Sequence, residues 1–108
     1  MPHGQYAAYR RITSRQARAQ MQANPRAIIL DVRTRQEYDA EHIPGATLMP
    51  DYAIKAQATQ VLPDKNALIL VYCKGGTRSQ NAAKLLASMG YTNVCDFGGI
   101  NSWPYERE

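Results

Sequence analysis

The chain has 108 residues, of which 44% are hydrophobic and 20% charged, and this balance fits one globular domain rather than a two-domain enzyme or a disordered chain. The net charge is +4, and the sequence contains no nucleic-acid-binding motif. This favours a solvated positive surface or an attraction for anions over nucleic-acid binding. The longest apolar run, residues 67–72, is far shorter than the roughly 20 residues of a membrane span, and residues 1–11 lack a secretory signal. We therefore expect a cytoplasmic protein that binds neither nucleic acid nor membrane.

The first third of the chain predicts an arm, a helix and a strand. We expect residues 1–11 to form a loose N-terminal arm and residues 12–108 to form the domain. Thr13 and Gln16 have the spacing of a helix capping box, and an Asn-Pro pair stops the helix that they begin. Residues 28–32 form a short β-branched run, which is typical of a buried strand.

The middle of the chain predicts two further strands and a helix. Residues 33–42 are polar with helical character, and a Pro-Gly turn leads from them to a brief strand at residues 47–49. A second helix begins near Asp51 and ends before Pro63. Residues 67–72 are apolar at every position, as expected of a central parallel strand that is covered on both faces.

The last third predicts one helix and one strand. Residues 80–89 place apolar side chains at helical spacing, and Gly90 follows as a C-terminal cap. Residues 93–97 form a last short strand. Alternating short strands and helices predict an α/β fold with a largely parallel sheet.

A cysteine follows the most hydrophobic strand at its carboxyl end, where open α/β sheets bind their ligands. In the loop from Cys73 to Ser79, two glycines let backbone N–H groups converge, and the next helix adds its dipole. Lys74 and Arg78 add positive charge, so the loop favours the thiolate, which is the nucleophilic form. The alternative is an inert core cysteine beside a tight turn, but such a turn needs neither cation.

Six segments of the chain occur in an informative order over about residues 12–105. They are ILDVR (29–33), EY (37–38), HIPGA (42–46), CKGGTRS (73–79), GYTNV (90–94) and GGINSW (98–103). Together they resemble the successive signatures of single-domain rhodaneses, which are sulfurtransferases. The resemblance implies a rhodanese-like α/β fold, in which a five-stranded, mostly parallel sheet is flanked by helices on both faces.

The resemblance also implies roles for individual residues. Cys73 matches the catalytic nucleophile that takes sulfane sulfur as a persulfide, and the loop around it matches the cradle that holds this sulfur. Asp31 and Arg33 match the first signature, and they would lie at the rim of the site, with Asp31 supporting Arg78 and Arg33 facing an anionic donor. An ordinary strand-end ion pair is the alternative for both. The residues expected to bind substrate are Lys74, Gly75, Gly76, Thr77, Arg78, Ser79 and Arg33.

The implied activity is that of a thiosulfate sulfurtransferase. A small anionic donor such as thiosulfate would give sulfane sulfur to Cys73, and a thiol, cyanide in vitro, or a sulfur-accepting protein would receive it, without a cofactor or a metal. One alternative is a non-enzymatic interaction or sulfur-carrier module. Phosphatases and arsenate reductases of the same fold are another, but their loops resemble Cys, five residues and Arg, whereas four residues separate Cys73 from Arg78 here. No general acid for phosphoryl chemistry is evident in the sequence.

Other conspicuous residues are interpreted as structural. His42 lies in the HIPGA segment and is interpreted as a turn residue rather than as part of a Cys-His dyad or a metal site. Cys95 lies in a short apolar strand, which favours core packing over a disulfide with Cys73, and two cysteines cannot form the disulfide framework of a small secreted fold. Tyr91 and Trp103 are expected to be hydrophobic anchors.

Overall fold

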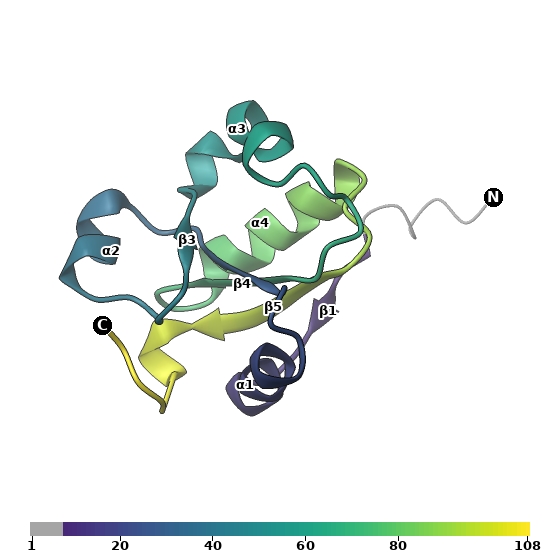
Figure 1. Cartoon of the computed structure of the whole chain (residues 1–108). Coiled ribbons are helices and arrows are strands. Elements are labelled where there is room, and N and C mark those ends of the chain that lie inside the picture. Colours follow the sequence, from purple (N-terminus) through teal and green to yellow (C-terminus); the bar gives the residue numbers. More distant parts are fainter. Residues whose placement is uncertain (1–7) are drawn as a thin grey trace.

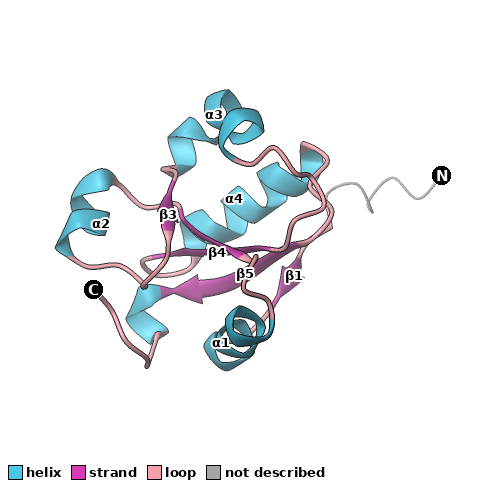
Figure 2. Cartoon of the chain, viewed as in Figure 1, coloured by secondary structure: helices cyan, strands magenta, loops and turns pink. Residues whose placement is uncertain are grey.

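The computed structural model describes residues 8–108, in which parallel strands form one sheet with helices on both faces (Figures 1 and 2). Over these described residues the sheet has five strands in the order β1-β5-β4-β2-β3, and every neighbouring pair is parallel. The strands are β1 (Arg10–Arg11), β2 (Ile28–Asp31), β3 (Thr47–Leu48), β4 (Ile69–Cys73) and β5 (Val94–Gly99). This arrangement confirms the predicted α/β fold, with a five-stranded parallel sheet flanked by helices on both faces.

Two faces of the sheet are covered by different helices, which are α1 (Ser14–Ala23), α2 (Arg35–Ala40), α3 (Ile54–Val61) and α4 (Thr77–Ser88). On one face, Val71 and Cys73 of β4 belong to the same apolar cluster as buried residues of α3 and α4. On the other face, Leu70 and Tyr72 cluster with Ala17 of α1 and with the C-terminal segment. Figure 1 shows α1 below the sheet and α3 and α4 above it. All five residues of β4 are buried, as predicted for a central strand.

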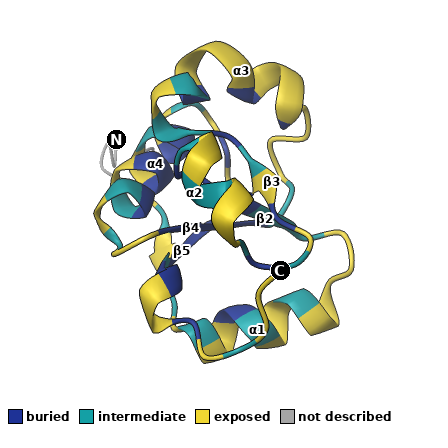
Figure 3. Cartoon of the chain, turned by 90° about the vertical axis from the view of Figure 1, so that its left-hand side faces the viewer, coloured by how far each residue is buried: buried dark blue, intermediate teal, exposed yellow. Residues whose placement is uncertain are grey.

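The helices begin and end for local reasons that the sequence contains. Thr13 accepts a hydrogen bond from the backbone N–H of Gln16, and the side chain of Gln16 accepts one from the N–H of Thr13, which confirms the predicted capping box. Thr34 and Glu37 form a second capping box at the start of α2. The outer surfaces of the helices remain exposed, whereas the two central strands β4 and β5 are almost entirely buried (Figure 3).

One prediction about the N-terminus is wrong. Arg10 and Arg11 were expected in the loose arm, but they form β1 and pair with Cys95 and Asp96 of β5. Both arginines are exposed, so this edge strand is held by backbone hydrogen bonds and has no apolar pattern to find in the sequence. Residues 1–7 of the predicted arm lie outside the described residues.

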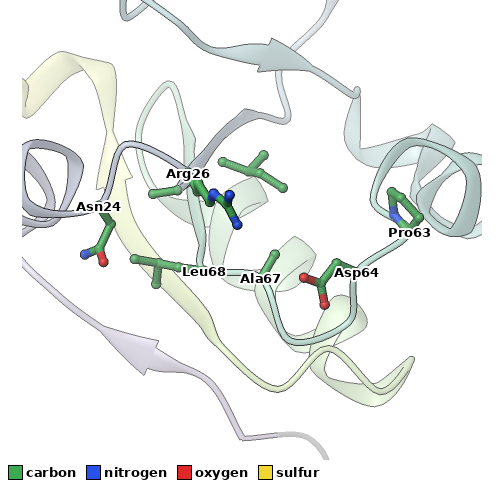
Figure 4. Close-up of a pocket in the computed structure, with 8 residues that line it drawn as sticks. Asn24, Arg26, Pro63, Asp64, Ala67 and Leu68 are labelled. Atoms are coloured by element: carbon green, nitrogen blue, oxygen red, sulfur yellow. The ribbon is translucent and has the colours of Figure 1, made fainter.

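No helix within residues 8–108 is long and apolar enough to cross a membrane. The carboxyl ends of β2, β4 and β5 meet at one edge of the sheet, where the loop after β4 begins. At the opposite edge, a pocket of about 460 Å³ lies among the segments that enter β2 and β4. Figure 4 shows Arg26, Pro63, Asp64 and Leu68 around this pocket. These residues precede β2 and β4, whereas the cysteine loop follows β4.

Candidate active site

The cysteine loop begins at the last residue of β4 and runs directly into α4. Cys73 is 1% exposed, and its Sγ accepts a hydrogen bond of 3.0 Å from the backbone N–H of Gly76. Gly76 has a φ of +111°, a left-handed conformation that residues with a side chain rarely adopt. Because Thr77 begins α4, the positive end of this helix lies beside the loop. The backbone therefore offers positive charge to the sulfur.

Ser79 lies in the first turn of α4 and is fully buried against the cysteine. Its Oγ is 3.4 Å from the Sγ of Cys73. The same hydroxyl also lies 3.1 Å from the carbonyl oxygen of Gly76 and 3.2 Å from that of Gly98. One hydroxyl hydrogen therefore has three acceptors within reach, and one of them is the sulfur.

The turn that ends β5 forms the wall on which the cysteine loop rests. Gly98 has a φ of +88°, and Gly99 packs so closely against the loop that a methyl group there would overlap the carbonyl of Lys74. The same carbonyl accepts a hydrogen bond of 3.1 Å from the N–H of Asn101. The glycine pair of the GGINSW segment thus permits the two segments to touch.

Arg78 does not meet Asp31 as expected, because Glu37 of α2 takes that place. The two guanidinium nitrogens Nη1 and Nη2 of Arg78 donate to the two carboxylate oxygens of Glu37 at 2.7 and 2.9 Å. The hydrogen bonds from Arg78 lower the pKa of Glu37 to about 2, and Glu37 in turn raises the pKa of Arg78. Arg78 therefore holds α2 against the loop, and its charge is largely compensated.

Asp31 instead pairs with Arg33, which was the alternative interpretation of these two residues. The carboxylate accepts from Nε and Nη2 of Arg33 at 3.0 and 2.7 Å, and from the hydroxyl of Tyr72 at 2.6 Å. Burial opposes the charge on Arg33 more than any other single effect, but the hydrogen bonds and charge attraction of Asp31 and Tyr72 together outweigh it and raise the pKa of Arg33. Burial, together with the bond to Asp31, raises the pKa of Tyr72. This ion pair is buried beneath the rim, on the α1 face of the sheet.

A pocket of about 190 Å³ lies beside the cysteine loop. Its lining includes Arg33, Lys74 and Asn101, together with the carboxylates of Glu37 and Glu41. Both carboxylates are compensated, since Glu37 pairs with Arg78 and Glu41 with Arg107. Within residues 8–108, no acidic side chain lies within ion-pair distance of Lys74, which is exposed. Lys74 is thus the uncompensated cation of this pocket.

The remaining candidates lie away from the sulfur. His42 stacks on Tyr38 with ring centroids 3.8 Å apart, and its Nδ1 lies 2.9 Å from the carbonyl oxygen of Tyr38. Cys95 is buried in the cluster on the opposite face of the sheet from Cys73, which confirms core packing. Among the described residues, no three His, Cys, Asp or Glu side chains are grouped so that they could hold a metal ion.

The two hydrophobic anchors are placed as expected. Tyr91 is 2% exposed and Trp103 is 4% exposed. Tyr91 donates a hydrogen bond of 2.6 Å to the carbonyl of Leu62, and Trp103 donates one of 3.0 Å to the carbonyl of Glu106.

Sequence reasoning gave no role to three polar residues that are buried or partly buried in the structure. Glu37 stands in the recognised EY segment, and its spacing from Thr34 is that of a capping box, but neither signal names Arg78 as its partner. Tyr72 was assigned only to an apolar strand, although its hydroxyl bonds Asp31. Asp96, a fully buried acid in an apolar strand, is itself a signal that sequence reasoning passed over.

Comparisons with known proteins agree with this geometry. A family model described as rhodanese-like domain matches residues 13–105. The chain is 39% identical over 71 residues to the thiosulfate sulfurtransferase PspE of Escherichia coli strain K12, covering 66% of this chain and 68% of that protein. A solved structure described as a rhodanese with anions from E. coli superposes with a TM-score of 0.71 at 34% identity, covering 76% of this chain and 96% of that one.

The sequence also matches part of some much longer proteins. It is 36% identical over 85 residues to the adenylyltransferase and sulfurtransferase uba4 of Ogataea parapolymorpha, which covers 78% of this chain but 22% of that protein. The chain therefore spans about a fifth of the length of this relative, so the match concerns one region of it.

Proposed function

The chain belongs to the rhodanese-like domain family, and we propose that it transfers sulfane sulfur from thiosulfate to a thiophilic acceptor through a persulfide on Cys73. The observation that carries this proposal is the hydrogen bond of 3.0 Å from the Gly76 N–H to the Sγ of Cys73 at the start of α4. A loop that directs a backbone donor and a helix dipole at a sulfur favours an anion there, and both thiolate and persulfide are anions.

In the first step, the thiolate of Cys73 attacks the outer sulfur of thiosulfate. The sulfur–sulfur bond of thiosulfate breaks, and sulfite leaves with the electron pair. Lys74, exposed at the pocket beside the loop, would draw the dianion in. The backbone N–H groups of the loop would then hold the negative charge that moves to the outer sulfur of the persulfide.

In the second step, an acceptor removes that outer sulfur. When cyanide is the acceptor, its carbon attacks the outer sulfur, the sulfur–sulfur bond of the persulfide breaks, and its electron pair returns to Cys73 as thiolate. Thiocyanate leaves, so the cycle is ping-pong and consumes no oxidant or reductant. Ser79, 3.4 Å from the sulfur, would donate to the thiolate that is regenerated.

Arg33 and Arg78 take indirect parts in this proposal. Arg78 is tied to Glu37 by two hydrogen bonds, so it shapes the loop and leaves the attraction of the donor to Lys74. Arg33 lines the pocket, while its Nε and Nη2 are bound to Asp31. Only its Nη1, which makes no hydrogen bond within residues 8–108, is left to face an anionic donor. Gly75, Gly76 and Thr77 would bind the sulfur through backbone amides.

The length of the cysteine loop argues against the phosphatase and arsenate reductase alternatives. Four residues separate Cys73 from Arg78, and the arginine that would bind a tetrahedral oxyanion is occupied by Glu37. A sulfur carrier without turnover would need the same persulfide on Cys73. It would differ from the proposed enzyme only in the acceptor that removes the sulfur. We retain thiosulfate as the donor, a thiol or a sulfur-accepting protein as the natural acceptor, and a cytoplasmic location as predictions.

The mass of the intact protein tests the proposal directly. Thiosulfate should add one sulfur atom, about 32 Da, and cyanide should remove it as thiocyanate. Cys73→Ser should abolish the adduct, whereas Cys95→Ser, which changes the cysteine on the other face of the sheet, should keep it. An adduct that survives on the Cys73→Ser protein would refute the assignment, and an adduct that cyanide cannot remove would favour the carrier role.

A further inference from the structure

A buried carboxylate that the sulfur-transfer steps do not use lies on the same face of the sheet as Cys73. Asp96 of β5 is 0% exposed and stands beside Val71 of β4, two residues before the cysteine. Its Oδ2 is buried without a hydrogen-bond partner among the described residues, and the nearest cation is the Nε of Arg11 at 3.7 Å. An acid in such a place costs stability, because burial removes the water that solvates its charge.

Asp96 sits at an irregularity in the pairing of β4 with β5. Val71 pairs with Asp96, but the next pair joins Cys73 to Gly99, so β5 contains one residue more than β4 over this interval. Such a bulge leaves a backbone N–H without a ladder partner. That N–H belongs to Gly98, and it donates to the Oδ1 of Asp96 at 2.9 Å. The carboxylate thus fixes the bulge.

Two contacts connect this bulge to the sulfur of Cys73. The carbonyl oxygen of Gly98 lies 3.2 Å from the Oγ of Ser79, and the same Oγ lies 3.4 Å from the Sγ of Cys73. We propose that Asp96 is a positioning residue of the active site, which acts on Cys73 through the Gly98 carbonyl and the Ser79 hydroxyl. The inference rests on the proposed function for its consequence in sulfur transfer, but its geometry is independent of the donor.

The hydroxyl of Ser79 can hydrogen-bond both the thiol and the thiolate of Cys73 only if its oxygen keeps its position. With Cys73 as a thiol, the S–H donates to the Oγ and the hydroxyl hydrogen goes to the Gly98 or Gly76 carbonyl. With Cys73 as a thiolate, the hydroxyl rotates about its C–O bond and donates to the sulfur. Asp96 holds the Gly98 carbonyl in position, so this rotation needs no movement of Ser79.

The test compares two replacements of Asp96. Asp96→Asn keeps an oxygen that can accept the Gly98 N–H, whereas Asp96→Val fills the same space without an acceptor. We expect Asp96→Asn to keep the rate of Cys73 alkylation by iodoacetamide at pH 7 within about twofold of wild type. Asp96→Val should slow it about three- to tenfold, the effect of one lost hydrogen bond. Peptide mapping by mass spectrometry assigns the alkylated cysteine.

A double-mutant cycle with Ser79→Ala separates positioning from a general loss of structure. If Asp96 acts through Ser79, Asp96→Val should have little further effect on alkylation once Ser79 is alanine. Independent effects that multiply in the double variant would overturn the proposal, as would wild-type reactivity in folded Asp96→Val. Should the valine variant fail to fold, Asp96→Ala replaces it in the same cycle.

Asp64 supplies the matched control. Its Oδ1 accepts the N–H of Asn66 at 2.9 Å, the same bond two residues ahead, but it lies at the pocket on the opposite edge of the sheet (Figure 4). Asp64→Ala should leave Cys73 alkylation unchanged. Alkylation does not depend on sulfur transfer, so failure of wild type to accept sulfur from thiosulfate would refute the proposed function and leave this cycle interpretable.

Discussion

Two buried aspartates flank the central strand β4, and they use the same local turn on opposite faces of the sheet. Asp31 of β2 accepts the backbone N–H of Arg33 at 2.9 Å, and Asp96 of β5 accepts that of Gly98 at the same distance. Both aspartates are 0% exposed. Asp31 lies on the α1 face beside Tyr72, whereas Asp96 lies on the α4 face, as Cys73 does.

The difference between them lies in the second oxygen. The Oδ2 of Asp31 accepts from Arg33 and from Tyr72, so its charge is compensated inside the protein. The Oδ2 of Asp96 accepts no hydrogen bond within the described residues, and Arg11 beside it is 60% exposed. The same turn is therefore found with a fully hydrogen-bonded ion pair at Asp31 and with a carboxylate that has one unbonded oxygen at Asp96. We expect mutations to cost much stability at Asp31 and little at the Arg11 contact of Asp96.

The largest effect is expected from Asp31→Ala. It leaves the guanidinium of Arg33, 4% exposed, buried without its counter-charge, which typically costs about 3–5 kcal/mol. Urea unfolding should show this loss in the free energy of unfolding, while Asp64→Ala, which breaks the same turn at an exposed site, should cost about 1 kcal/mol or less. Equal losses in the two variants would contradict the comparison.

A smaller loss is expected from Tyr72→Phe. The hydroxyl donates to Asp31 at 2.6 Å and accepts the N–H of Ile43 at 3.1 Å, so its removal leaves a buried donor unpaired at a cost of about 1–3 kcal/mol. Tyr91→Phe is the matched control, because within residues 8–108 that buried hydroxyl bonds only the carbonyl of Leu62. Urea unfolding should rank Tyr72→Phe as the more destabilising of the two, and the reverse ranking would show that Asp31 does not depend on the hydroxyl.

Glu37→Gln tests the ion pair between Glu37 and Arg78. The pKa of Glu37 falls from 4.5 to about 2 in the fold, so the pair contributes stability above pH 4.5 and loses it as the pH falls toward 2. Both side chains are partly exposed, which limits the contribution at pH 7 to about 1 kcal/mol. Unfolding measured at pH 7 and pH 3 should show wild type closer to Glu37→Gln at pH 3, and a constant gap would contradict this assignment.

The smallest effect is expected from Arg11→Ala. Its Nε lies 3.7 Å from Asp96, and the side chain is 60% exposed, so water and salt screen the pair. The free energy of unfolding should fall by less than about 1 kcal/mol. Chemical denaturation at low and high salt checks this, and a loss as large as that of Asp31→Ala would mean that Arg11 compensates Asp96 as fully as Arg33 compensates Asp31.

The sequence predicted most of the fold, because most helices and strands have a recognisable pattern within their own residues. The apolar run at residues 67–72 marks β4 within two residues of its observed start, and the Thr13 and Gln16 pair marks the start of α1. The exception is β1, whose Arg10–Arg11 backbone pairs with β5 without any apolar side chain to reveal it. Sequence patterns report side-chain burial, so an exposed edge strand held by backbone bonds escapes them.

The loop itself was also readable from the sequence, because Cys73, its glycines and the helix that follows are contiguous. Their order along the chain places the N–H of Gly76 and the start of α4 at Thr77 close to the sulfur of Cys73. Whether these residues perform sulfur transfer stays a prediction that the intact-mass experiment decides.

What only the tertiary structure decided is the pairing of charges around that loop. Arg78 could have met Asp31 or Glu37, and the packing of α2 over the loop brought it to Glu37 at 2.7 Å. Asp31 met Arg33 and Tyr72 on one face, and Asp96 met the Gly98 bulge on the other. Composition and spacing identify the groups that carry charge. A salt bridge, however, depends on distances of a few ångströms between distant segments, and only the packed sheet and its bulge set those distances.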